Sequence, residues 1–171
     1  MSYQRVIIYL IILSLLLAIP GCAGLGLTPP LSEGQEGVLY LEPANLTIIP
    51  GQDFNIELKT ASINNLKGYS ITLTYDPALL SLKEVTEGPF LSAKGETFFY
   101  KKVDETKGTI LIDCALLGSD LSISGEGTLA ALSFTSLKAG STNLTFKLTK
   151  TRDTYNKEIV TTKRNAVVKS K

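Results

Sequence analysis

Histidine and tryptophan are missing from this 171-residue chain, and only two of its residues are cysteines. Histidine is the usual general base of enzymes and the commonest metal ligand, so its absence removes both of these roles. The sequence also contains no nucleophile–base pair, metal-ligand cluster or cofactor-binding loop. We therefore expect a protein that is not an enzyme and that holds neither a cofactor nor a metal ion; the alternative left open is a calcium ion in a loop that contains Asp120 or Asp153.

The chain also lacks an excess of charge of either sign. The 17 basic and 16 acidic side chains leave a net charge of +1, and no concentrated basic patch stands out. A nucleic-acid-binding surface needs such a patch, so we do not expect a nucleic acid as partner. Hydrophobic residues make up 44% of the chain and charged residues 19%, which is typical of a chain that folds. The length indicates one domain, which we expect to be monomeric.

The one long apolar run lies at the N-terminus, from Val6 to Ile19 behind the single charge of Arg5. This is the pattern of a secretory signal, and the run is shorter than the roughly 20 residues of a membrane span. It ends in Ile19-Pro20-Gly21-Cys22, which resembles a lipobox, in which the cysteine is lipidated and becomes the new N-terminus. We expect residues 1–22 to be a lipoprotein signal peptide with lipidation at Cys22; the alternative is an uncleaved anchor helix that continues to Leu27.

Both interpretations place the remainder of the chain outside the cytoplasm and attach it to a membrane. A lipobox cysteine carries more than one acyl chain, which holds a protein firmly. Ala23 after the cysteine does not resemble an inner-membrane retention signal, so the outer membrane is the expected location in a cell with two membranes. Residues 23–37 are rich in Gly, Pro, Ser and Glu and are expected to form a flexible linker, which leaves 38–171 for the folded domain.

From Val38 onward, short strand signals recur about every ten residues, with turn residues between them. The clearest is Gly68–Leu80 (GYSITLTYDPALL), in which Tyr69, Ile71, Leu73 and Tyr75 alternate with small hydroxyl residues. No sustained helical period appears, and about nine short strands predict an all-β, two-sheet antiparallel sandwich. The same alternation predicts a core that includes Phe54, Ile56, Leu58, Ile71, Leu73, Leu144, Phe146 and Leu148.

Cys114 is the second cysteine, and lipidation of Cys22 would leave it without a partner for an internal disulfide. It lies in the apolar stretch 109–115, which predicts a small buried side chain. A catalytic role is disfavoured because the chain has no histidine to activate the thiol.

The order of these features resembles a cohesin domain over nearly the whole stretch from Val38 to Val168. The resemblance is carried by the segments Pro50–Phe54, Asn65–Tyr69, Leu73–Leu80, Val85–Gly88, Ser124–Phe134 and Ala139–Thr142. The Tyr75-Asp76-Pro77 corner, followed about fifty residues later by a Gly-x-Gly-x-Leu-Ala strand, is the most specific part. Membership of the family implies a nine-stranded jelly-roll sandwich, which agrees with the strand count.

Cohesins bind dockerin modules through one sheet, built from the third, fifth, sixth and eighth strands. The resemblance places these strands at Tyr69–Tyr75, Thr97–Val103, Thr109–Ala115 and Thr142–Leu148. The candidate partner-binding residues are therefore Ser70, Thr72, Thr74, Tyr100, Lys101, Leu111, Asp113 and Lys147. Family members that bind cellulosomal dockerins carry an Asn and an Asp as anchors on the third strand, where this chain has Gly68 and Ser70. The usual dockerin specificity is thus not implied.

Two alternatives to a contact surface for a dockerin-like module remain. The polar strand positions are also what an ordinary solvated sheet face would show. A carbohydrate-binding module with a polysaccharide ligand has a similar fold, although the lack of Trp leaves only Tyr69, Tyr75, Tyr100 and a few other aromatics for a binding platform. Among Phe98, Phe99 and Tyr100, we expect at least one aromatic side chain to be exposed, because the three lie on both sides of one strand.

Overall fold

Side chains alternate between buried and exposed along most of residues 37–171, which are the residues that the computed structural model describes. The segment 1–22 with Cys22, and the linker before Gly37, lie outside the described residues. Gly34–Lys171 forms one compact unit, and its hydrophobic core is supplied by residues from Leu39 to Val168. Within the described part of the chain, no helix has the length and hydrophobicity needed to cross a membrane.

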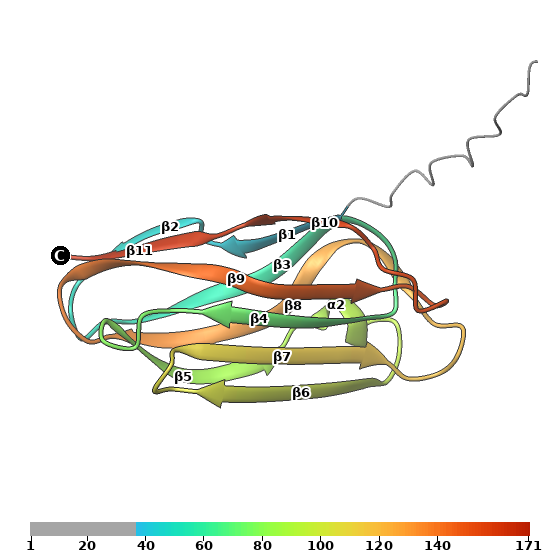
Figure 1. Cartoon of the computed structure of the whole chain (residues 1–171), viewed down its shortest axis with the longest axis horizontal. Coiled ribbons are helices and arrows are strands. Elements are labelled where there is room, and N and C mark those ends of the chain that lie inside the picture. Colours follow the sequence, from blue (N-terminus) through green and yellow to red (C-terminus); the bar gives the residue numbers. More distant parts are fainter. Residues whose placement is uncertain (1–36) are drawn as a thin grey trace, which may run out of the picture. The chain divides into compact units, whose positions relative to one another are not determined.

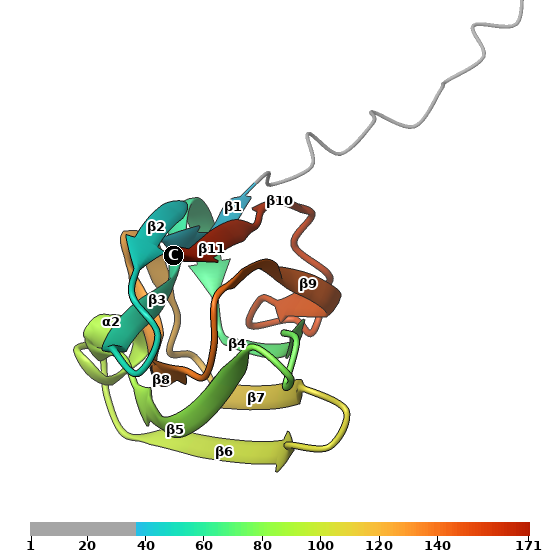
Figure 2. The ribbon, with the colours of Figure 1, turned by 90° about the vertical axis from the view of Figure 1, so that its left-hand side faces the viewer.

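The strands form two sheets, as predicted, and the chain is an all-β sandwich (Figure 1). One sheet has six strands, in the order β2 (Asn45–Ile48), β11 (Ala166–Ser170), β9 (Gly140–Arg152), β4 (Gly68–Thr74), β7 (Thr109–Leu116) and β6 (Thr97–Asp104). The other has five strands, in the order β10 (Thr161–Arg164), β1 (Gly37–Glu42), β3 (Asp53–Leu66), β8 (Ile123–Ser136) and β5 (Leu80–Glu87). Figure 2 shows the two layers end-on.

The first and last strands each cross from one sheet to the other. β1 lies in the five-stranded sheet and β2 in the six-stranded sheet, and β10 and β11 divide in the same way. These segments pair with one another in parallel, β1 with β10 and β2 with β11, whereas the other strand pairs are antiparallel. Counted as two interrupted strands, the four segments bring the total to the nine that the sequence predicts.

The core between the sheets consists of the inward-facing residues of the long strands. Phe134 stacks on Phe54 with ring centroids 5.6 Å apart and meets Tyr75 edge-on at 5.3 Å, a favourable aromatic geometry. Ile71 and Leu73 on β4 are fully buried, as predicted. The one helix of the described residues is α2 (Pro89–Ser92), which places Phe90 and Leu91 against the core beside β8 (Figure 2).

Candidate functional site

The six-stranded sheet brings the four strands of the predicted binding face together, in the order β9-β4-β7-β6. Figure 1 looks directly onto these strands, which run side by side. Their side chains alternate between the core and the outside, because successive residues of a strand point to opposite faces. On β4, Tyr69, Ile71 and Leu73 are buried, whereas the hydroxyl residues between them are half-buried and face outward.

The strand register arranges the outward residues in rows across the four strands. In the order β9, β4, β7, β6, the rows are Arg152–Gly68–Ala115–Phe98, Lys150–Ser70–Asp113–Tyr100, Leu148–Thr72–Leu111–Lys102 and Thr145–Thr74–Thr109–Asp104. We call these residues, together with Lys147, the outer grid. Residues directly opposite each other on neighbouring strands are close enough for their side chains to interact; the hydroxyl oxygens of Thr74 and Thr145, for example, are 2.7 Å apart.

Most of the predicted contact residues lie on the outer grid. Ser70, Thr72, Thr74, Leu111 and Asp113 are half-buried grid residues of the central strands β4 and β7. Tyr100 lies on the edge strand β6 and is exposed, as is its neighbour in the grid, Phe98. The expectation that at least one aromatic residue of this strand is exposed is therefore confirmed, while Phe99 packs against the core.

Lys101 was predicted on the wrong side of the sheet. It is the register partner of Ile112, which is fully buried, so it points to the inner side of β6. There its ammonium group donates a hydrogen bond to the carbonyl oxygen of Val85 on β5, in the opposite sheet. Because adjacent strand residues face opposite ways, Tyr100 and Lys101 cannot share a face, and Lys102 occupies the outer position.

Leu148 is the second correction. It was predicted in the core but is 48% exposed on the outer grid, opposite Thr72. The register of β9 against β4 shifts between Thr72 and Leu73, whose partners are Leu148 and Phe146, so Lys147 is an extra residue on β9. Such a β-bulge reverses the alternation on one strand only. The bulge places exposed Lys147 beside Leu111 and Lys102.

A hollow lies at one end of the grid, where the residues have small side chains or none. Gly68 and Ala115 occur side by side in the first row, and Ser70 follows in the second. The resulting depression of about 580 Å³ is bounded by Phe98 on β6 and by Lys150 and Arg152 on β9. A smaller hollow of about 270 Å³ lies at the other end and is lined by Lys102, Asp104, Lys107, Thr109, Leu111 and Lys147.

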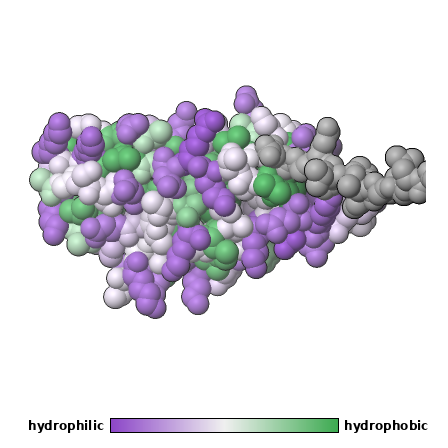
Figure 3. Space-filling view, turned by 45° about the horizontal axis from the view of Figure 1, so that its top comes forward, coloured by the Kyte–Doolittle hydropathy of each residue, from purple (hydrophilic) through white to green (hydrophobic). Residues whose placement is uncertain are grey.

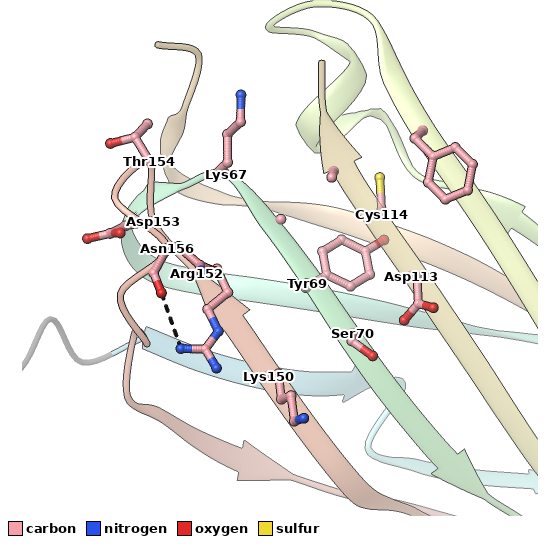
Figure 4. Close-up of a pocket in the computed structure, with 13 residues that line it drawn as sticks. Lys67, Tyr69, Ser70, Asp113, Cys114, Lys150, Arg152, Asp153, Thr154 and Asn156 are labelled. Atoms are coloured by element: carbon pink, nitrogen blue, oxygen red, sulfur yellow. Dashed lines mark hydrogen bonds between the residues drawn. The ribbon is translucent and has the colours of Figure 1, made fainter. Parts of the chain in front are cut away.

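Asp113 lies in the larger hollow beside Ser70 (Figure 4). Its register partner on the other side is Tyr100 of β6. Its Oδ1 atom is buried and accepts no hydrogen bond from any described residue. A buried carboxylate oxygen without a donor is costly, and most such atoms in folded proteins are paired. A ligand that brings a donor to this position would satisfy it.

The basic side chains of the grid are not neutralised. Lys102, Lys147, Lys150 and Arg152 form no ion pair with any described residue; Arg152 instead donates a 3.3 Å hydrogen bond to the carbonyl oxygen of Asn156 (Figure 4). Asp104 is paired with Lys107, at 3.2 Å. Hydrogen bonds from the backbone and side chain of Lys107 hold the pKa of Asp104 below its usual range.

The outer face of the five-stranded sheet is different, because its polar groups are paired with one another. Lys59 contacts Glu42 and Lys83 contacts Asp53, each at 2.7 Å. Hydroxyl groups of β8 donate hydrogen bonds to carboxylate or amide oxygens of β3: Thr128 to Glu57, Ser133 to Asn55 and Thr135 to Asp53. Lys59 and Lys83 on this face are thus paired with carboxylates, whereas the four basic side chains of the grid are not.

Reactive chemistry is not evident in the described part of the chain. No three His, Cys, Asp or Glu side chains of residues 37–171 lie close enough to hold a metal ion. Cys114 is buried, as predicted, with 2% of its surface exposed. Burial, followed by the Glu87 carboxylate, raises the pKa of the Cys114 thiol to about 12, so the thiol is protonated at neutral pH. A broad, nearly flat face with two hollows is suited to contact with another molecule.

Sequence reasoning missed Phe98, Lys102, Leu148, Lys150 and Arg152 as grid residues. Strict alternation from Tyr100 would have found Phe98 and Lys102. The predicted eighth strand ended at Leu148, whereas β9 continues to Arg152. The alternation of Lys150 and Arg152 with Thr149 and Thr151 was the signal for this continuation.

Comparisons with known proteins agree with this architecture. The sequence matches the model of the family described as "Cohesin domain" over residues 44–170. No match is found among curated protein sequences. Among solved structures, a non-cellulosomal cohesin from the hyperthermophilic archaeon Archaeoglobus fulgidus is similar, with a TM-score of 0.68 and 18% identity over 80% of this chain and 91% of that one.

Two further similar structures are complexes. One is the sixth cohesin of scaffoldin B from Acetivibrio cellulolyticus with a mutant Cel5 dockerin: its TM-score is 0.66, with 17% identity over 80% of this chain and 99% of that one. The other is a cohesin–dockerin complex from Clostridium thermocellum, with a TM-score of 0.66 and 15% identity over 78% of this chain and 90% of that one. With a family match that spans most of the residues from β2 to β11, the chain belongs to the cohesin domain family.

Proposed function

We propose that this domain is a non-catalytic recognition module that binds a dockerin-type protein module through the outer grid. The observation that carries the proposal is the register that assembles β9, β4, β7 and β6 into one open face with small side chains at its centre. Ser70, Thr72 and Thr74 leave the middle of the sheet without bulky obstacles, so that a partner can approach closely. Solved cohesins of the same fold occur in complexes with dockerins, which supports this class of partner.

The experiment that tests the proposal is capture of a partner by the domain. Immobilised Gly34–Lys171, the compact unit that holds the whole core, is exposed to the secreted and envelope proteins of the source organism, and retained proteins are identified by mass spectrometry. We expect capture of a protein with a dockerin-type repeat. The double variant Thr72→Arg, Thr74→Arg should abolish the capture, because two long charged side chains would cover the centre of the grid.

The matched control is Ser133→Arg, Thr135→Arg on the outer face of the other sheet. These residues are half-buried, as Thr72 and Thr74 are, and they face outward from a central strand, so the cost to folding is similar. Capture should survive in this variant. Circular dichroism and thermal unfolding establish that both variants are folded. Undiminished capture by the folded Thr72/Thr74 variant would contradict the proposal.

We further propose that the domain is exported and held at the cell envelope by lipid on Cys22, at the outer membrane in a cell with two membranes. The support is the order of a positive charge, an apolar run and a lipobox-like ending in residues 1–22. Metabolic labelling with a radioactive fatty acid tests this. The full chain should incorporate label and fractionate with membranes, and Cys22→Ala should do neither; an unlabelled wild type would refute the lipid anchor.

A further inference from the structure

The outer grid combines two features: positive charge that is not neutralised by ion pairs, and exposed apolar side chains among the charged ones. Lys147, Lys150 and Arg152 follow one another along β9, and Lys102 lies on β6 at the other margin. Asp113 and Asp104 are the acidic residues of the grid, and Asp104 is neutralised by Lys107. The chain as a whole carries a net charge of only +1, so this face is more positive than the rest of the molecule.

Exposed apolar side chains lie between these charges. Phe98 is 57% exposed, Tyr100 44% and Leu148 48%, and half-buried Leu111 and Ala115 connect them across the sheet. Figure 3, which views the molecule obliquely from the edge that carries β2 and β11, shows the hydrophobic surface of that side as spots among hydrophilic side chains. Basic side chains interspersed with exposed apolar ones are one half of a complementary protein contact, whose other half combines acidic with apolar side chains.

We propose that the grid binds a protein surface that combines small apolar side chains with acidic ones. The carboxylates of that surface pair with Lys147, Lys150, Arg152 and Lys102, and a hydroxyl or amide of its centre donates a hydrogen bond to Oδ1 of Asp113. This inference rests on the proposed function, because it takes the grid as the contact face, and it adds the sign of the partner's charge. A basic partner would place like charges opposite each other, which is costly in a desolvated contact.

A protein partner is favoured over an anionic polysaccharide by the apolar side chains. Leu111, Leu148 and Ala115 gain less from the hydroxyl-rich surface of a sugar chain than from an apolar counterpart, which removes more of their surface from water. The exposed rings of the grid, Phe98 and Tyr100, lie together on the edge strand and not across the sheet. An acidic, amphipathic protein segment complements both the positive charge and the apolar surface of the grid.

Synthetic peptides provide a direct test of the charge sign. Two amphipathic helical peptides share one Leu/Ala stripe, and Glu flanks the stripe in the first and Lys in the second. Each is titrated into isotopically labelled Gly34–Lys171, and binding is located by amide chemical-shift changes. We expect the Glu peptide to shift grid residues such as Ser70, Leu111 and Asp113, and its affinity to fall at least about tenfold between low salt and 0.5 M salt. The Lys peptide should leave the grid unchanged.

Charge-reversal variants locate the electrostatic contribution. Lys150→Glu, Arg152→Glu should weaken binding of the Glu peptide at least about tenfold. The neutral variant Lys150→Gln, Arg152→Gln should lose less affinity for the Glu peptide than the charge-reversal variant. This graded loss would show that the charge, and not a folding defect, weakens binding. The matched control is Lys163→Glu, Arg164→Glu on β10, which changes the net charge equally at exposed residues of the other sheet and should have no effect.

Three results with the two peptides would overturn the inference. They are equal or tighter grid binding by the Lys peptide, no response of Glu-peptide binding to the Lys150/Arg152 variants, and no grid shifts with either peptide. Polygalacturonate is titrated as a further probe. If it shifts the grid at lower carboxylate concentration than the Glu peptide, and Leu148→Ala does not weaken it, the ligand is an anionic polysaccharide and not a protein.

The failure of this inference is distinguishable from failure of the proposed function. If a dockerin-type protein is captured in a Thr72/Thr74-dependent manner but the Lys peptide is preferred, the function stands and the charge sign is wrong. If no dockerin-type protein is captured but the Glu peptide binds the grid, the surface chemistry stands and a different protein class is the partner.

Discussion

The hydroxyl group of Tyr69 donates a 2.8 Å hydrogen bond to the carbonyl oxygen of Leu129 inside the core. Tyr69 belongs to β4, at the centre of the six-stranded sheet, and Leu129 to β8 of the five-stranded sheet, so the bond joins the two layers directly. The same carbonyl oxygen accepts a 2.9 Å bond from the backbone N–H of Gly88, just before α2. One oxygen thus ties together both sheets and the helix.

We expect Tyr69→Phe to lower the free energy of unfolding by about 1 kcal/mol, the net value of one hydrogen bond whose acceptor keeps another partner. Urea denaturation of Gly34–Lys171 measures the change. Tyr155→Phe is the control, because Tyr155 is 87% exposed and should tolerate the loss of its hydroxyl. Equal stability of the two variants would show that the bond between the sheets contributes nothing.

Cys114 should resist alkylation in the folded protein. Its side chain is buried, and a pKa of about 12 leaves roughly one thiol in ten thousand ionised at pH 8, whereas the thiolate is the reactive form. Iodoacetamide labelling of Gly34–Lys171, followed by mass spectrometry, should therefore be negligible in buffer and complete in denaturing urea. Rapid labelling without denaturant would contradict the burial of this residue.

Stability should fall at alkaline pH. Burial raises the pKa of the Cys114 thiol from 9.0 to about 12 and also raises the pKa of the Tyr69 hydroxyl above its usual 10.0. The unfolded chain releases the Cys114 proton above pH 9 and the Tyr69 proton above pH 10, while the folded chain retains both. The stabilising contribution is therefore full below pH 9 and is lost progressively as the pH rises. Between its pKa in the unfolded chain and its pKa in the folded chain, each group lowers the free energy of unfolding by about 1.4 kcal/mol per pH unit.

Denaturation curves at pH 8, 9, 10 and 11 test this pH dependence. Cys114→Ala removes one of the two groups, so its stability should fall less steeply than that of the wild type between pH 9 and 11. Parallel pH profiles for the two proteins would mean that Cys114 ionises equally in the folded and unfolded states.

Gly108 should be intolerant of any side chain. Its φ of +58° is in the left-handed region, and a Cβ atom would overlap the carbonyl oxygen of Tyr75 and lie 2.8 Å from Cδ of Pro77. Gly108→Ala should therefore cost about 2–4 kcal/mol, the sum of backbone strain and overlap with the Tyr75–Pro77 corner. Gly51→Ala is the control. The φ of Gly51 is +82°, but an added Cβ atom would have no atom within 4 Å beyond the adjoining residues, so only about 1 kcal/mol of backbone strain is expected. Equal losses would refute the steric contribution.

The strands and the buried sides of most of them were predictable because alternation is a local signal. Ile71 and Leu73 are buried and Thr72 faces outward, as the pattern of β4 alone predicts. The position of Leu148 was not predictable, because the bulge at Lys147 arises from the pairing of β9 with β4, which lies far away in the sequence. The pattern of one strand carries no information on where its neighbour forces an extra residue.

Lys101 shows a different limit of prediction from the sequence. Its neighbours alternate correctly, but a lysine on the inner side of a strand contradicts the usual polarity of a core. β6 is an edge strand, and the aliphatic part of the side chain can follow the margin of the sandwich until its ammonium group reaches the carbonyl oxygen of Val85. Whether a strand lies at the edge or the centre is decided by the topology of the whole chain, so the exception could not be found locally.

The parallel pairing of the first and last strands in both sheets has a consequence for how the domain folds. β1 and β2 find their partners β10 and β11 only after more than a hundred intervening residues have been made. Contacts between such distant segments form slowly, because the chain must close a long loop before it gains anything from them. The sandwich therefore cannot close during synthesis of its first half, and the chain stays open until its final strands emerge.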